Sequence, residues 1–154
     1  MSRSRHGPEV LVVGAGIVGA AIALGLARQG RRVTLVEPRP PHAWSSEDAP
    51  DPRVYAIAPG SRQLLEELGV WPAIAAARVQ PYRAMQVWDA GGGRPLHLQA
   101  GESGLAELGH IVEAGLIQWQ LWQALQRAGV ALHAPAEVLG LEIEDDEAVL
   151  ELEH

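Results

Sequence analysis

The chain has 154 residues, a net charge of −7 and no cysteine. Its length is enough for one domain with a hydrophobic core, and its apolar (47%) and charged (20%) fractions are those of a globular protein. The lack of cysteine excludes disulfides, thiolate metal sites and cysteine nucleophiles, and the negative charge argues against a nucleic-acid-binding surface. No apolar run reaches the ~18 residues that a membrane span needs. We interpret residues 1–8 as a flexible N-terminus and expect a cytoplasmic protein.

The segment from residue 10 to residue 37 predicts a strand, a helix and a second, parallel strand. The apolar run Val10–Val13 is typical of a buried strand, and the Ala- and Leu-rich stretch that follows predicts a helix reaching Arg28. Gly30 is expected to end this helix. The β-branched run Val33–Val36 then predicts the second strand. This order is the first unit of a dinucleotide-binding α/β fold.

Three glycines follow the first strand with the spacing G-x-G-x-x-G: Gly14, Gly16 and Gly19. The first permits the tight turn, the second lets a backbone approach a pyrophosphate, and the third lets the helix pack close to the strand. The amino end of the helix offers free N–H groups and partial positive charge to phosphates. Glu37 follows Gly14 by 23 positions, so its carboxylate is expected to accept hydrogen bonds from ribose hydroxyls.

A proline-rich segment follows Glu37 and predicts a long loop, with Pro38 and Pro52 near its two ends. Long loops that persist in compact domains are often functional. Arg39 lies two positions after Glu37. Two interpretations of Arg39 stay open, namely a contact with an adenine ring and a solvated side chain.

The remaining elements are predicted from hydrophobic periodicity and from glycine and proline positions. They are, in chain order, an apolar segment 54–58, helices from Pro59 to Gly69 and at 72–77, a strand around 85–88 that pairs with 95–99, a short strand 111–113, a helix 116–127, a parallel strand 130–133, and a hairpin of 138–144 and 148–152. We see no internal repeat and no second domain.

Other candidate chemistry is weak. The histidines show no metal-ligand spacing, and the serines lack the context of a nucleophile elbow. The acidic run 142–147 predicts a solvated hairpin tip. We therefore assign no catalytic and no metal-binding residue.

Three further segments carry a family resemblance: DPRVYAIAPGSRQLLEELGVW (51–71), PYRAMQVWDAGG (81–92) and GHIVEAGLIQWQLWQAL (109–125). Together with the glycine motif, they resemble the N-terminal part of the flavoprotein aromatic hydroxylases, the para-hydroxybenzoate hydroxylase superfamily. Within it, they are most similar to the ubiquinone-biosynthesis hydroxylases. The resemblance implies a Rossmann-like FAD-binding domain with a parallel sheet, a β-hairpin element and part of a small antiparallel sheet.

The resemblance also implies roles for individual residues. The three glycines would hold the FAD pyrophosphate, and Glu37 would hold the adenosine ribose. Arg53 matches a family arginine near the flavin and the substrate entrance. Gln118 would reach toward the FAD from its helix.

In such enzymes NAD(P)H reduces the flavin, and O₂ then supplies one oxygen atom to a phenol ring while the other leaves as water. For a full-length protein the resemblance implies hydroxylation of a lipophilic, polyprenyl phenol. It leaves open a peripheral association with the inner membrane or with a quinone-synthesis complex.

We expect the chain to be a truncated piece of such an enzyme. Family members carry an Asp-Gly motif and a later Gly-Asp motif that are missing here, so residues 9–151 would be the N-terminal part of the FAD-binding domain. Residues 152–154 resemble the start of a vector-encoded tag. Such a piece is expected to lack hydroxylase activity, to bind FAD weakly and to self-associate through bare strand edges and apolar faces.

Two alternatives share the glycine motif. A nicotinamide-binding oxidoreductase domain would normally continue with another βα unit after Glu37, where this chain has a proline-rich loop. A non-enzymatic dinucleotide-binding module predicts a native gene that stops near residue 150.

Overall fold

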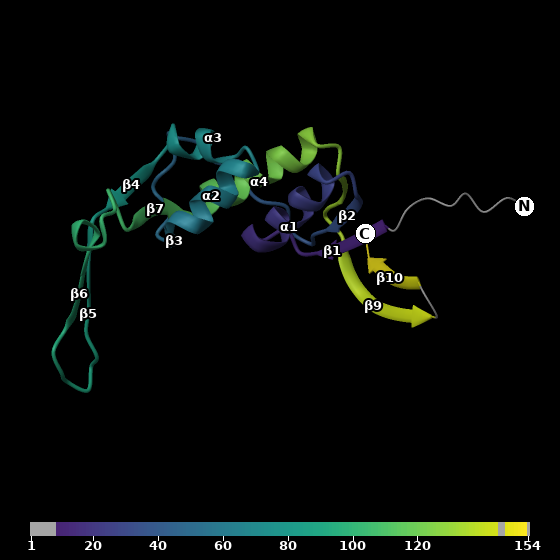
Figure 1. Cartoon of the computed structure of the whole chain (residues 1–154). Coiled ribbons are helices and arrows are strands. Elements are labelled where there is room, and N and C mark those ends of the chain that lie inside the picture. Colours follow the sequence, from purple (N-terminus) through teal and green to yellow (C-terminus); the bar gives the residue numbers. More distant parts are fainter. Residues whose placement is uncertain (1–8, 145–146, 154) are drawn as a thin grey trace, which may run out of the picture. The chain divides into compact units, whose positions relative to one another are not determined.

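The computed structural model describes residues 9–144 and 147–153. The predicted flexible N-terminus, the tip of the last hairpin and His154 lie outside these residues. The chain divides into two compact units (Figure 1). One combines the segment up to Trp44 with the segment from Ile117 onward, and the other comprises Ser45–Leu116.

The first unit is built on a parallel sheet with the strand order β1-β2-β8. Its strands are β1 (Glu9–Val13), β2 (Arg32–Val36) and β8 (Ala131–His133). The helix α1 (Ile17–Arg28) makes the crossover from β1 to β2 that parallel pairing requires. The chain turns after α1 at Gly30, whose φ of +77° favours glycine. Most of β2 is buried, because it is the central strand of this sheet.

The helix α4 (Ala114–Arg127) precedes β8, and the boundary between the two units falls in its first turn. From Ile117 onward its apolar positions recur three and four residues apart, as expected of one helix face. Buried side chains of the first unit come from α1, β2 and α4, and include Leu24, Leu35, Ile117, Leu121 and Leu125. The hairpin of β9 (Glu137–Glu144) and β10 (Glu147–Glu153) completes this unit.

The second unit contains an antiparallel sheet with the order β3-β7-β4. Its strands are β3 (Val54–Ile57), β4 (Val79–Tyr82) and β7 (Gly109–Glu113). Two helices, α2 (Pro59–Glu67) and α3 (Trp71–Ala75), connect β3 to β4. A separate hairpin of β5 (Ala84–Val87) and β6 (Leu96–Gln99) is followed by the short 3₁₀ helix η1 (Ala100–Ser103) (Figure 1).

The predicted fold class is confirmed, since the chain is α/β with a parallel sheet, β-hairpins and a small antiparallel sheet. The strand β4 was not predicted. It contains Pro81, which is tolerated because β4 lies at the edge of its sheet. Among the described residues, no helix has both the length and the apolar composition needed to cross a membrane.

Candidate functional site

The turn between β1 and α1 depends on Gly14. Its φ is +99°, a conformation that residues with a side chain rarely adopt. Its N–H donates to the carbonyl oxygen of Val36 at 2.8 Å. The turn is therefore fixed against the carboxyl end of the neighbouring strand β2.

Gly16 is the N-cap residue of α1 and lies exposed on the loop. A Cβ built there would meet no atom within 4 Å, so the space in front of the backbone is open. As a glycine, Gly16 has no side chain that could cap this helix end. Because the first N–H groups of a helix have no intrahelical acceptor, this end has donors and partial positive charge available for an anion. A dinucleotide diphosphate fits these properties.

Gly19 has the opposite environment. A Cβ there would overlap the carbonyl oxygen of Gly14 and lie 3.2 Å from its carbonyl carbon. The first turn of α1 therefore packs directly on the glycine loop. This is the close approach that the third glycine of the motif was predicted to allow.

Two side chains hold the peptide groups of Ala15 from opposite sides. The Ala15 N–H donates to Oε2 of Glu37 at 2.6 Å, and the Ala15 carbonyl accepts from Nε2 of Gln118 at 3.0 Å. Ala15 is only 1% exposed, so both groups would be costly to leave without a partner. The other oxygen of Glu37 accepts from the N–H of Arg39 at 2.9 Å. These contacts hold the loop in one conformation.

The structure thus brings five of the predicted residues together around Ala15: Gly14, Gly16, Gly19, Glu37 and Gln118. Glu37 has further acceptor capacity, because a carboxylate offers about four lone-pair positions. Its contact with a ribose and the reach of Gln118 to FAD stay predictions. Arg39 contributes its backbone to this cluster, and its side chain is exposed, so its contact with an adenine also stays a prediction.

Arg53 belongs to the second unit. Its side chain is 80% exposed and forms an ion pair with Asp51 at 3.2 Å. The Arg53 N–H also donates to Oδ1 of Asp51 at 2.9 Å. This backbone hydrogen bond, followed by the side-chain hydrogen bonds of Arg53, lowers the pKa of the Asp51 carboxyl. Asp51 therefore stays ionised at neutral pH, and the predicted role of Arg53 beside a flavin stays a prediction.

Sequence analysis missed an ion pair between a half-buried arginine and a buried glutamate in the second unit. Nη1 of Arg78 lies 3.2 Å from Oε1 of Glu113, at the carboxyl end of β7. The side chain of Glu113 is 8% exposed, and its Oε2 accepts from the N–H of Asp51 at 3.0 Å. An acidic residue that directly follows the apolar pair Ile111-Val112 is the one signal that could have indicated a buried, paired carboxylate.

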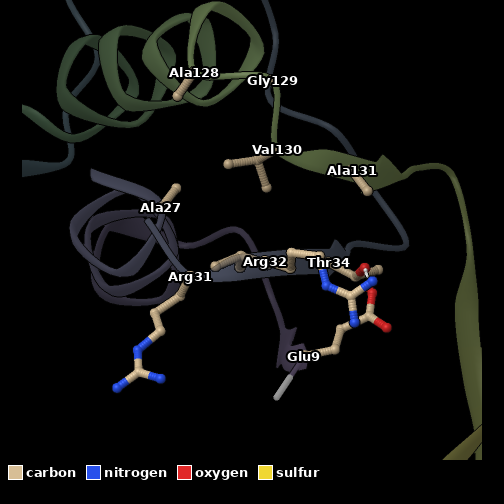
Figure 2. Close-up of a pocket in the computed structure, with 10 residues that line it drawn as sticks. Glu9, Ala27, Arg31, Arg32, Thr34, Ala128, Gly129, Val130 and Ala131 are labelled. Carbon is tan, nitrogen blue, oxygen red and sulfur yellow. Dashed lines mark hydrogen bonds between the residues drawn. The ribbon is translucent and has the colours of Figure 1, made fainter. Parts of the chain in front are cut away.

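A cavity of about 330 Å³ lies at the amino-terminal ends of the parallel strands, at the other end of the sheet from the glycine loop (Figure 2). It is lined by the amino ends of the strands, by the carboxyl ends of α1 and α4, and by polar side chains that include Glu9, Arg31 and Arg32. Thr34 donates to Glu9 at 2.7 Å there. None of the predicted site residues lines this cavity. The glycine loop, at the carboxyl ends of β1 and β2, has the position that ligands of open α/β sheets occupy.

Comparisons with known proteins show which proteins this chain is similar to. Residues 9–50 match the family model described as FAD dependent oxidoreductase. A structure of aklavinone-11 hydroxylase with FAD and aklavinone superposes with a TM-score of 0.68 at 24% identity, covering 97% of this chain and 30% of that one. At this identity the superposition establishes the fold. The glycine loop and the family match make the first part of this chain similar to the FAD-dependent oxidoreductases.

Relatives among characterised proteins narrow the class. The 3-demethoxyubiquinol 3-hydroxylase of Escherichia coli K12 is 40% identical over 147 residues, which are 94% of this chain and 37% of the relative. The mitochondrial ubiquinone biosynthesis monooxygenase COQ6 of Xenopus tropicalis is 36% identical over 77% of this chain and 26% of its own length. The chain is thus related to the ubiquinone-biosynthesis hydroxylases, which confirms the predicted resemblance. It spans about a third of the length of these relatives.

Proposed function

We propose that this chain binds FAD and forms part of a flavin monooxygenase that hydroxylates a polyprenyl phenol in ubiquinone biosynthesis. NAD(P)H would be the reductant and O₂ the co-substrate. The observation that carries the proposal is the open backbone of Gly16 at the uncapped end of α1, in a chain 40% identical to a 3-demethoxyubiquinol 3-hydroxylase. A peripheral association with the membrane, where such a lipophilic substrate resides, belongs to the same proposal.

FAD, when bound, supplies the redox chemistry and oxygen activation that protein side chains lack. The chain's own contribution would be binding and orientation. The amino end of α1 would hold the diphosphate, with Gly16 providing the close approach. Glu37 would accept hydrogen bonds from the adenosine ribose while it holds the N–H of Ala15. Gln118, through the carbonyl of Ala15, would keep the loop from shifting under the diphosphate.

Titration of the purified chain with FAD and with NADH tests the choice of dinucleotide. We expect FAD to bind more tightly than NADH, because residues 9–50 match an FAD-dependent family. We also expect the FAD to be lost on gel filtration and hydroxylation to be absent, because the chain spans 37% of the relative's length. Dissociation constants from isothermal calorimetry provide the comparison. Tighter binding of NADH would favour the nicotinamide-binding alternative.

We also propose that the chain self-associates through apolar strand faces. In the β5–β6 hairpin, Met85 lies opposite Leu98 and Val87 lies opposite Leu96. Because opposed residues share a face, these four side chains, which are 37–57% exposed, cover one side of the hairpin. The opposite side carries Gln86 and His97, so the apolar side is the one suited to association.

Light scattering across a concentration series tests this self-association. We expect the mass to rise above that of one chain, and the double substitution Val87→Glu with Leu96→Lys to return it to one chain. Gln86→Glu with His97→Lys is the matched control, because this pair lies opposite in register on the other side of the same hairpin. A wild-type mass equal to one chain at every concentration would count against self-association.

A further inference from the structure

Arg78 holds residues 45–48 of the long segment between β2 and β3, within the second unit. The two N–H bonds of Arg78 Nη2 donate to the backbone carbonyls of Ser46 and Asp48, each at 2.8 Å, and one of them is shared with the more distant carbonyl of Ser45 at 3.4 Å. A guanidinium offers five donors in a fixed planar fork, so it can hold several acceptors at once. These contacts fix residues 45–48.

Glu113 connects this arginine to the next part of the segment. Its Oε1 pairs with Arg78, and its Oε2 accepts the N–H of Asp51. A carboxylate buried to this degree is stable only when it is paired and hydrogen-bonded. The Arg78–Glu113 ion pair, in which only the carboxylate is buried, therefore fixes the segment at two places, residues 45–48 and Asp51.

Asp51 in turn contacts both the backbone and the side chain of Arg53. It accepts the backbone N–H of Arg53 at 2.9 Å and faces the guanidinium at 3.2 and 3.3 Å. The carbonyl of Arg53 accepts from the N–H of Ala114, which directly follows Glu113 in the chain. The Arg53 N–H is thus held by Asp51, which Glu113 contacts, and the Arg53 carbonyl is held by Ala114, which follows Glu113. By contrast, the Arg53 side chain is exposed, and its ion pair with Asp51 is the contact that limits its rotamers.

We infer that Arg78 and Glu113 are positioning residues that act through Asp51 to hold Arg53 in one orientation. The inference rests on the proposed function and on the predicted contact of Arg53 with the flavin. The Arg78–Glu113 pair, rather than packing of its own side chain, would then set the direction of Arg53. No motif of the glycine loop includes either positioning residue.

Hydrogen exchange of the ligand-free chain provides the first test. Glu113→Gln removes the charge that Arg78 pairs with, so we expect the amides of residues 45–53 to exchange at least about tenfold faster. Arg78→Lys keeps the charge and loses the planar fork, so we expect the larger effect at residues 45–48. Glu66→Gln is the matched control, because it removes the exposed pair of Glu66 with Arg62. Amides of residues 59–67 distinguish local loosening from global unfolding.

A double-mutant cycle on FAD affinity provides the second test. If the pair acts through Arg53, Glu113→Gln should weaken FAD binding about tenfold in the wild-type chain and less than twofold in the Arg53→Ala background. Equal effects in both backgrounds would show a merely structural role and overturn the inference. Unchanged exchange at 45–53 would also overturn it. Faster exchange in a chain that binds no FAD would refute the proposed function and the role of Arg53, while it would support the ordering of the segment.

Discussion

Replacing Gly16 with valine is expected to abolish FAD binding in a chain that stays folded. A Cβ at this position meets no protein atom within 4 Å, and Gly16 is exposed, so we expect the ligand-free structure to accept the substitution. It would, however, occupy the space where the diphosphate has to approach the backbone. Losing two hydrogen bonds to a charged group, at about 1.5 kcal/mol each, weakens binding at least about 100-fold. Flavin fluorescence titration and urea unfolding measure the two effects separately.

The chain offers matched controls for this substitution. Gly60 also lies in the first turn of a helix, and a Cβ there also meets nothing within 4 Å, so Gly60→Val should leave FAD binding unchanged. Gly19→Ala should behave differently from both, because its Cβ overlaps the Gly14 carbonyl and overpacking costs typically about 1–3 kcal/mol of stability. Wild-type FAD affinity in Gly16→Val would refute the assignment of the diphosphate to this loop.

Glu37→Ala is expected to weaken both the fold and FAD binding. The N–H of Ala15, a residue that is 1% exposed, would lose its acceptor, which costs about 1–3 kcal/mol. The loop would also lose the carboxylate expected to hold the ribose. We therefore expect a lower urea midpoint together with an FAD dissociation constant raised at least about tenfold. The two expected effects share one cause, because the same carboxylate supports the loop and is expected to face the ligand.

Glu37→Gln separates the two roles. Glutamine keeps one acceptor oxygen for Ala15, so the urea midpoint should recover most of the loss while FAD affinity recovers less. Glu102→Ala, a substitution of an exposed acid in η1, should change neither quantity. If Glu37→Ala matched the wild-type chain in stability and affinity alike, the carboxylate would have no part in the site.

Local pattern was sufficient for most of the fold. The apolar runs Val10–Val13 and Val33–Val36 and the glycines around α1 predicted the observed elements closely. Strand and helix periodicity is a local property of neighbouring residues, so it can be recognised without the tertiary structure. The strand β8 was also expected beside β2, since a helix between two apolar runs favours a parallel crossover. The strand β4 was missed because its place at a sheet edge, which makes Pro81 acceptable, depends on β7.

The candidate site was only partly predictable. Its glycines were predictable because the tight turn and close packing that require them involve only nearby residues. Glu37 was predictable because it follows the next strand at the expected spacing. Gln118 was singled out by family resemblance, but nothing in its surroundings along the chain indicated a partner at Ala15, 103 positions away. Glu113 and Asp51 are 62 positions apart, and no periodicity connects them.

The sequence by itself determined that a tight turn joins a buried strand to a helix and that an acid ends the next strand. Only the tertiary structure decided that Glu37 and Gln118 hold the two peptide groups of Ala15, and that Arg78 and Glu113 fix the segment leading to Arg53. The physical reason is the range of the forces involved. Backbone conformation is limited by clashes between neighbouring atoms, whereas a hydrogen bond forms between whichever groups the folded chain brings within about 3 Å.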